Sequence, residues 1–184
     1  MGLDMYLYKK TFLKTGKHWD ESQRQTISIN TDGVVDQNIK RERVTFITET
    51  VGEWRKANQI HNWFVHNVQN NVDDCKEYHV SVEQLEELLE TCKKVVTSLT
   101  VSKVETTQVE VYSIQEKKTV MEDLVTFLDT SIAEQLLPTQ SGFFFGSTDY
   151  DEYYLEDLKD TIETLETILS EDNEWSDFYY QSSW

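Results

Sequence analysis

Metal binding is the first chemistry that the residue types of this sequence suggest, because cysteine and histidine are the ligands that zinc prefers. The candidates are His61, His66, Cys75, His79 and Cys92. His61 and His66 are five residues apart, so they do not share a helix face, and the sequence contains no C-x2-C pair. Since a zinc site needs three or four converging ligands, we expect these side chains to be scattered and the protein to hold no metal.

Nucleophilic catalysis would need a cysteine or serine beside a suitable base. Cys75 follows two aspartates, whose negative charges disfavour the reactive thiolate. Cys92 falls on the apolar side of an expected helix, so we expect it in the core. Ser141 and Ser147 lack the G-x-S-x-G context of a nucleophile elbow. The sequence therefore predicts no catalytic residue, and we expect the protein not to be an enzyme.

A glycine-bounded loop, Gly142-Phe-Phe-Phe-Gly146, superficially suggests a phosphate-binding turn. It lacks the lysine of a P-loop and the spacing of a dinucleotide-binding fingerprint. The acids that follow, Asp149, Asp151 and Glu152, would repel phosphate. We instead expect a turn that places one or more phenylalanines in the core, with glycine allowing unusual φ angles, and we expect no cofactor.

An acidic array around one helix is the most pronounced chemical feature. Glu152, Glu156, Asp160 and Glu163 fall in one sector of a helical wheel, and Lys159 is the single cation of residues 149–184. The array could imitate the phosphates of a nucleic acid and bind a basic groove, or it could only keep the protein soluble. For the first interpretation, the expected partner-binding residues are Asp149, Tyr150, Asp151, Glu152, Glu156, Asp157, Asp160 and Glu163.

Charge is spread unevenly along the chain. Of the net charge of −17, residues 1–70 carry +2, residues 71–148 carry −8 and residues 149–184 carry −11. Because phosphate contacts need lysine and arginine, we expect no direct binding of nucleic acid. Such a field attracts basic surfaces instead.

The bulk composition predicts one folded domain. The 184 residues include 12% aromatic side chains, one proline and six glycines, which suits a real core and few linkers. No run approaches the roughly 20 apolar residues that span a bilayer. No signal peptide is evident, and two cysteines suit a reducing compartment. We expect a cytoplasmic protein without a membrane partner, and the sequence leaves its oligomeric state open.

Hydrophobic periodicity predicts the elements of the first half. Alternation predicts a strand over residues 2–9, followed by a polar loop. Thr26–Ile29 and Val44–Ile47 are β-type runs on either side of an Asp32-Gly33 turn signal. Apolar residues at helical spacing predict a helix over Val51–Gln69. Ser81 with Gln84 forms a capping box that should open a second helix.

The second half combines β-type and helical patterns. Residues 100–113 are rich in valine and threonine and predict a strand or hairpin. Val120–Leu137 is expected to be helical and residues 138–150 to form a loop. Asp151–Ser170 is the clearest helix, and residues 174–184 are β-prone. The stripe of that helix is Leu155, Leu158, Ile162, Leu165 and Leu169.

These elements predict an α+β fold, with a small antiparallel sheet packed with about four helices in a single domain over residues 1–184. The strands and helices do not alternate regularly, as they would in a doubly wound sheet.

Four stretches together resemble a known group of proteins. They are MGLDMYLYKK at 1–10, VGEWRKANQIHNWFVHNVQ at 51–69, VDDC at 72–75, and LLPTQSGFFFGSTDYDEYY at 136–154. The combination resembles a family of small proteins from tailed phages and prophages of gut and Gram-positive bacteria. The resemblance implies a phage accessory protein, without an established reaction or catalytic residues. Family members usually run more directly from the helix that begins at Ser81 to the LLPTQSGFFFGSTDYDEYY segment, so residues near 100–130 look like an insertion.

Two functions are expected from these observations. Small acidic proteins of such genomes often resemble inhibitors of host defence, anti-CRISPR proteins included, so the first is inhibition of a Cas9-type nuclease through its basic nucleic-acid channel. The alternative is a protein or enzyme that binds a nucleotide or signalling metabolite through the 138–150 loop. A convergent pocket around Gly142–Asp149 would favour the alternative, whereas a flat or convex acidic surface would favour the inhibitor.

Overall fold

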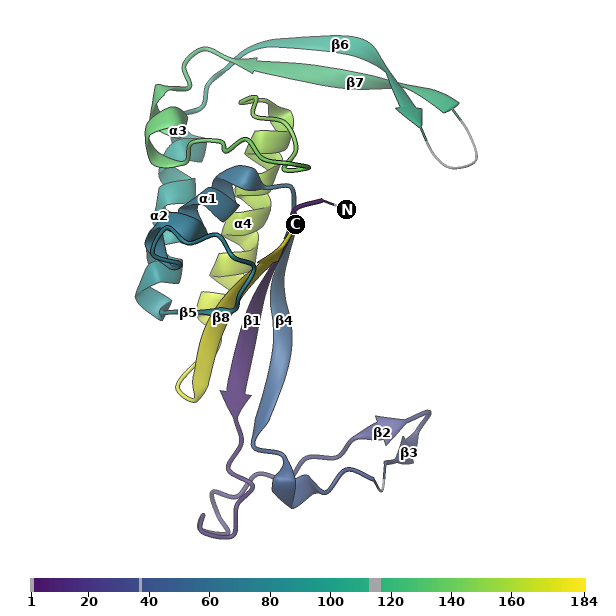
Figure 1. Ribbon diagram of the computed structural model, residues 1–184, viewed down its shortest axis with the longest axis vertical. Coiled ribbons are helices and arrows are strands. Elements are labelled where there is room, and N and C mark those ends of the chain that lie inside the picture. Colours follow the sequence, from purple (N-terminus) through teal and green to yellow (C-terminus); the bar gives the residue numbers. More distant parts are fainter. Residues whose placement is uncertain (1, 37, 113–116) are drawn as a thin grey trace.

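The largest sheet of the molecule is four-stranded and antiparallel. The computed structural model describes residues 2–36, 38–112 and 117–184. The sheet order is β4 (Phe46–Arg55), β1 (Asp4–Phe12), β8 (Ser176–Ser183) and β5 (Tyr78–Val80). The two central strands therefore come from opposite ends of the chain (Figure 1). This arrangement confirms the strands expected near residues 2–9 and 174–184.

One face of the sheet carries the core. Along β1 and its flanking residue, Leu3, Met5 and Leu7 are fully buried, whereas Tyr6 and Tyr8 between them are half-buried. This alternation follows from the period of two along a strand. On β8, Tyr180 is fully buried and stacks on Phe64 of the first helix, with ring centroids 3.9 Å apart. The sheet thus has one packed face and one partly exposed face.

Helices cover the packed face. They are α1 (Asn58–Asn67), α2 (Val82–Ser98), the short α3 (Ser131–Leu136) and α4 (Glu152–Ser170), which lie together in Figure 1. α2 and α4 contact each other, and α4 also contacts β4. The architecture confirms the α+β class with a small antiparallel sheet and four helices.

Local capping signals place the two longest helices. The capping box of Ser81 and Gln84 is present at the start of α2, with hydrogen bonds of 3.2 and 2.9 Å. Asp151 caps α4 by accepting a hydrogen bond from the backbone of Tyr154 at 3.0 Å. Each cap satisfies backbone N–H groups that lack a partner in the first turn. Both helix starts were therefore predictable from sequence.

Two predicted helices are wrong over part of their length. In the range Val51–Gln69, β4 continues to Arg55, the chain turns at Lys56 with φ 64°, and α1 begins at Asn58. In the range Val120–Leu137, strand β7 (Lys117–Phe127) precedes the short helix α3. Pairing of β4 with β1, and of β7 with β6 (Val101–Tyr112), outweighs the helical spacing, because a strand gains its stability from its partner.

Two hairpins extend from the sheet and helices (Figure 1). β2 (Asn30–Thr31) and β3 (Val34–Val35) flank the expected turn, with positive φ at Asp32 and Gly33, and the helical turn η1 (Arg41–Arg43) follows. The run Thr26–Ile29 is not a strand, which corrects that prediction. The longer hairpin pairs β6 (Val101–Tyr112) with β7. This hairpin covers most of the region near residues 100–130 that the family resemblance suggested to be an insertion. That it is an insertion stays a prediction.

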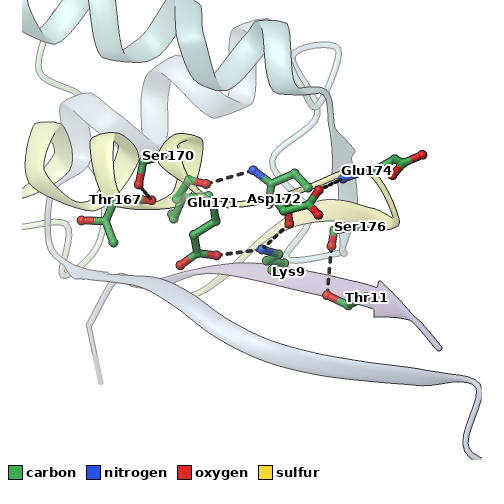
Figure 2. Close-up of polar contacts among 10 residues, drawn as sticks. Lys9, Thr11, Thr167, Ser170, Glu171, Asp172, Glu174 and Ser176 are labelled. Carbon is green, nitrogen blue, oxygen red and sulfur yellow. Dashed lines mark hydrogen bonds and ion pairs between the residues drawn. The ribbon is translucent and has the colours of Figure 1, made fainter. Parts of the chain in front are cut away.

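A buried lysine ties the end of α4 to the sheet. Lys9 of β1 is 6% exposed, and its Nζ donates to Glu171 Oε2 at 2.7 Å, just after α4 ends (Figure 2). The adjacent hydroxyls of Thr11 and Ser176 lie 2.9 Å apart across β1 and β8. A buried ammonium needs such a partner because its desolvation is costly.

Among the described helices, none is both long and apolar enough to cross a membrane.

Candidate functional site

A pocket of about 270 Å³ lies where three segments of the chain meet: the β4–α1 connection, the 138–150 loop and the start of α4. These segments lie together in the upper half of Figure 1. We call it the loop–helix pocket. Its lining consists mostly of polar side chains: Arg55, Lys56, Asn58, Gln59, Thr139, Gly146, Ser147, Asp149, Asp151, Tyr153, Tyr154 and Asp157.

Asn58 fastens the loop to α1. Its side chain is 2% exposed, and its Nδ2 donates to the carbonyl oxygens of Phe145 at 3.2 Å and Ser147 at 2.7 Å. Its Oδ1 accepts a hydrogen bond from the backbone of Gln140 at 2.9 Å. A single buried amide thus orders both ends of the loop, so the pocket wall is held in place by the fold.

Phe145 anchors the same loop by its apolar side chain. It is 4% exposed, whereas the neighbouring Phe143 and Phe144 are exposed. This confirms the prediction that the loop places a phenylalanine in the core. The φ angles of Phe144 and Gly146 are 66° and 96°, and a Cβ on Gly146 would lie 3.1 Å from Lys56 Cβ. Uncommon backbone conformations of this kind are retained where the surrounding contacts fix them, and they are frequent at ligand sites.

A carboxylate and an amide form the inner wall of the pocket. Gln59 is 2% exposed, and its Nε2 donates to Asp157 Oδ2 at 2.9 Å. Burial, followed by the negative charges of Asp160, Asp151 and Glu156, raises the pKa of Asp157 to about 6, against the hydrogen bond from Gln59, which lowers it. Perturbed carboxyl groups in a cleft are characteristic of functional sites, although ion-pair networks also produce them.

The eight residues predicted to bind a partner differ in their exposure and in their neighbours. Asp149, Asp151 and Asp157 line the loop–helix pocket. Tyr150 and Glu152 are half-buried, and the ring of Tyr150 packs against Tyr154, with centroids 4.9 Å apart. The remaining three, which we call the acidic row, are exposed on α4: Glu156, Asp160 and Glu163.

Sequence reasoning missed the β4–α1 side of the pocket. The available signal was the Asn58-Gln59 pair, which places two amides directly before the apolar residues of the helix. Buried amides need hydrogen-bond partners, so such a pair indicates a polar contact that the helix itself does not supply. Arg55 and Lys56 gave no comparable signal, because exposed cations are common on any surface.

The cysteine and histidine candidates lie elsewhere. Burial raises the pKa of the Cys92 thiol to about 12, so it is an inert core side chain, as predicted. His61 is fully buried, with its ring nitrogens 2.8 Å from the Tyr180 hydroxyl and 3.1 Å from Asp73 Oδ2. This chain of contacts connects α1 to the C-terminal strand. Within the described ranges, no three histidine, cysteine or acidic side chains are grouped so as to hold a metal ion.

The pocket has the features of a binding site for a small polar molecule. Its walls come from three segments fixed by buried hydrogen bonds, and a partly desolvated carboxylate faces it. Among the hydrogen bonds of the described residues, none joins a cysteine thiol, or the hydroxyl of Ser141 or Ser147, to a histidine ring. Comparison of the chain with protein-family models, with characterised proteins and with solved structures finds no match.

Proposed function

We propose that this protein binds a small polar metabolite in the loop–helix pocket. The observation that carries the proposal is the convergence of Asn58, Gln59 and Asp157 on one cavity that also contains the end of the 138–150 loop. Gly146, Ser147 and Asp149 of the Gly142–Asp149 stretch line this pocket, which favours the metabolite-binding alternative. Recognition sites for small molecules typically combine a concave shape with a few fixed polar groups.

The test is a thermal-unfolding screen of the purified protein with nucleotides, amino acids and polyamines, supported by native mass spectrometry of molecules that co-purify. A ligand at about 100 times its Kd stabilises the folded state by roughly 2.7 kcal/mol. Ser147→Trp should block the pocket and abolish the shift. Thr148→Trp is the matched control, because Thr148 is exposed in the same loop and does not line the pocket.

A second function is supported by the acidic row. We propose that Glu156, Asp160 and Glu163 can attract a basic protein, and the leading candidate is a Cas9-type nuclease of the bacterial host, which this protein would inhibit in the cytoplasm. The supporting observation is their exposure on a helix whose segment carries −11. Effectors of this type hold nucleic acid in a positively charged channel, and complementary charge speeds association.

Inhibition of guided DNA cleavage tests this second function directly. The purified protein should slow cleavage when it is added before the DNA, and it should not bind duplex DNA itself at about 150 mM salt. Cleavage at the uninhibited rate with an excess of protein would refute the nuclease as partner. The metabolite-binding proposal would be unaffected, because it concerns a different set of side chains.

A further inference from the structure

The loop–helix pocket contains more negative than positive charge near its inner wall. The lining has three carboxylates and two cations, and Arg55 already pairs with Asp4, with Nε 3.6 Å from Oδ1. The charged neighbours that act on Asp157 are Asp160, Asp151 and Glu156, all of them negative. Among the described residues, no lysine or arginine forms an ion pair with Asp157. The innermost carboxylate therefore lacks a positive counterpart.

Gln59 gives a second and independent indication. Its side chain is buried in the pocket wall, and its Nε2 is directed to Asp157, so the amide orientation leaves Oε1 as an acceptor. Within the described part of the chain, no hydrogen bond to Oε1 of Gln59 is found, and this oxygen is not one of the fully buried atoms without a partner. Oε1 is therefore accessible, so that a donor in the cavity can reach it.

We propose that the ligand of the loop–helix pocket carries a protonated amine, which donates hydrogen bonds to Asp157 and to Oε1 of Gln59. This inference rests on the proposed metabolite-binding function and specifies its chemistry. The two acceptors belong to side chains that are already hydrogen-bonded to each other, so they lie within reach of one nitrogen. An ammonium group has three donors and no acceptor, which matches this pair. Asp149 and Asp151 at the lining add to the attraction.

The same wall disfavours other ligand classes. Phosphate groups would meet three carboxylates, and the repulsion would oppose the attraction of Arg55 and Lys56. A neutral ligand could satisfy Gln59 but would leave the charge of Asp157 unbalanced. Amines could come from polyamines or from amino acids, which share the ammonium group and differ in whether a carboxylate accompanies it. Arg55 and Lys56 would favour the amino acid if that carboxylate lies near them.

Titration calorimetry at pH 7.5 with putrescine, spermidine and lysine tests the inference, with 1,4-butanediol as the neutral analogue of putrescine. At least one amine should bind, and butanediol should not. Asp157→Asn should weaken amine binding about tenfold or more, because the neutral amide cannot form the charge-assisted hydrogen bond that the carboxylate forms with an ammonium group. Asp160→Asn is the matched control on α4, is absent from the lining, and should change affinity by less than about threefold.

Each outcome has a distinct meaning. Binding of lysine but not putrescine identifies an amino-acid site, and the reverse identifies a polyamine site; both support the inference. Binding of a nucleotide, of Mg²⁺ or of butanediol that is unchanged by Asp157→Asn overturns the inference and leaves the proposed function standing. If no member of the panel binds and Ser147→Trp behaves as wild type in the thermal screen, both are wrong. Circular dichroism of each variant establishes that a loss of binding is not a loss of fold.

Discussion

Asp157 and Asp160 are the same residue type, three positions apart on one helix, yet their surroundings differ completely. Asp157 is partly desolvated, hydrogen-bonded to Gln59, and lines the loop–helix pocket. Asp160 is exposed and belongs to the acidic row. Burial disfavours the charged form of Asp157, in keeping with its raised pKa of about 6, whereas water screens the charge of Asp160.

This difference separates the two proposed functions within one acidic segment. A desolvated carboxylate interacts strongly at short range, so it suits the recognition of one group on a bound molecule. A solvated row of carboxylates acts weakly but over about a Debye length, roughly 8–10 Å at physiological salt, so it suits the steering of a large partner. The net charge of −11 over residues 149–184 combines both kinds.

The largest expected effect on stability comes from disrupting the packing of α4, which carries both Asp157 and the acidic row. Leu158 lies between Asp157 and Asp160 and is fully buried. Leu158→Ala should lower the free energy of unfolding by roughly 2–5 kcal/mol, the usual cost of a large-to-small change in a core. Chemical denaturation measures it. Leu155→Ala is the control, because Leu155 is half-buried and should cost less; equal and negligible costs would mean that α4 does not pack as described.

Releasing the 138–150 loop, which forms part of the loop–helix pocket, should have the next largest effect on stability. Asn58→Ala removes three hydrogen bonds that fasten the 138–150 loop, and should destabilise the protein by roughly 2–4 kcal/mol because its partners lose their hydrogen bonds in a largely buried setting. Asn62→Ala, one turn later on α1, removes one bond to Pro138 and should cost about 1 kcal/mol or less.

The thermal unfolding midpoints of the two variants measure this difference, and proteolysis within the loop should accelerate for Asn58→Ala. Equal midpoints for the two variants would show that Asn58 does not fix the loop. In that case the pocket wall would not be preformed, and the metabolite-binding proposal would lose its main support.

Much of the fold could be predicted from local patterns, and the exceptions share a cause. The capping box at Ser81 and the alternation in β1 are signals contained within a few residues. The predicted stripe of α4 is confirmed at Leu158 and Leu165, which are buried, whereas its other three members are only half-buried. The helix predictions are wrong over residues 51–55 of β4 and 120–127 of β7, because the stability of these strands comes from partners elsewhere in the chain. The three-residue strand β5 carries almost no periodic signal and exists only by pairing with β8.

The candidate site was predictable only in part for the same reason. The sequence drew attention to the 138–150 loop and to the acids after it, which lie on one side of the pocket. It could not divide those acids into buried and exposed sets, because the division depends on where Gln59 of α1 lies against α4. A helical wheel gives the direction of each side chain from its own helix, but not what that side chain meets.

Neutralising Asp157, the partly buried member of the Asp157–Asp160 pair, should have a smaller effect on stability. Asp157→Asn keeps an oxygen for the hydrogen bond from Gln59 and removes a charge that is costly to bury, so it should stabilise the folded protein by roughly 1–3 kcal/mol at pH 7.5. Asp160→Asn should change stability by less than about 0.5 kcal/mol, since Asp160 is exposed. Urea denaturation of both variants and of wild type gives the values.

The pH dependence gives an independent check. The pKa of Asp157 is higher in the folded protein than the ordinary value of 3.8, so the folded state holds this proton more tightly than the unfolded chain. The stability from Asp157 is therefore fully present below that ordinary value and is lost as the pH rises through about 6. The stability difference between Asp157→Asn and wild type should grow over this range. A difference that stays constant would place Asp157 in contact with bulk water.

The smallest effect on stability, and the clearest test of the acidic row, is expected from Asp160→Lys. The substitution turns the repulsive pair of Glu156 and residue 160 into an attractive i, i+4 pair, so the free energy of unfolding should rise by about 0.2–0.5 kcal/mol. Association with a Cas9-type nuclease should slow, and its dependence on salt should flatten, because long-range attraction acts on encounter more than on residence.

Glu21→Lys is the matched control: it makes the same change of net charge at an exposed residue far along the chain, in the 13–25 segment at the other end of the molecule (Figure 1). Stopped-flow binding at two salt concentrations compares the two variants with wild type. Equal slowing by both would assign the attraction to net charge alone, whereas unchanged association for Asp160→Lys would show that the acidic row serves only solvation and that the pocket is the one functional surface of α4.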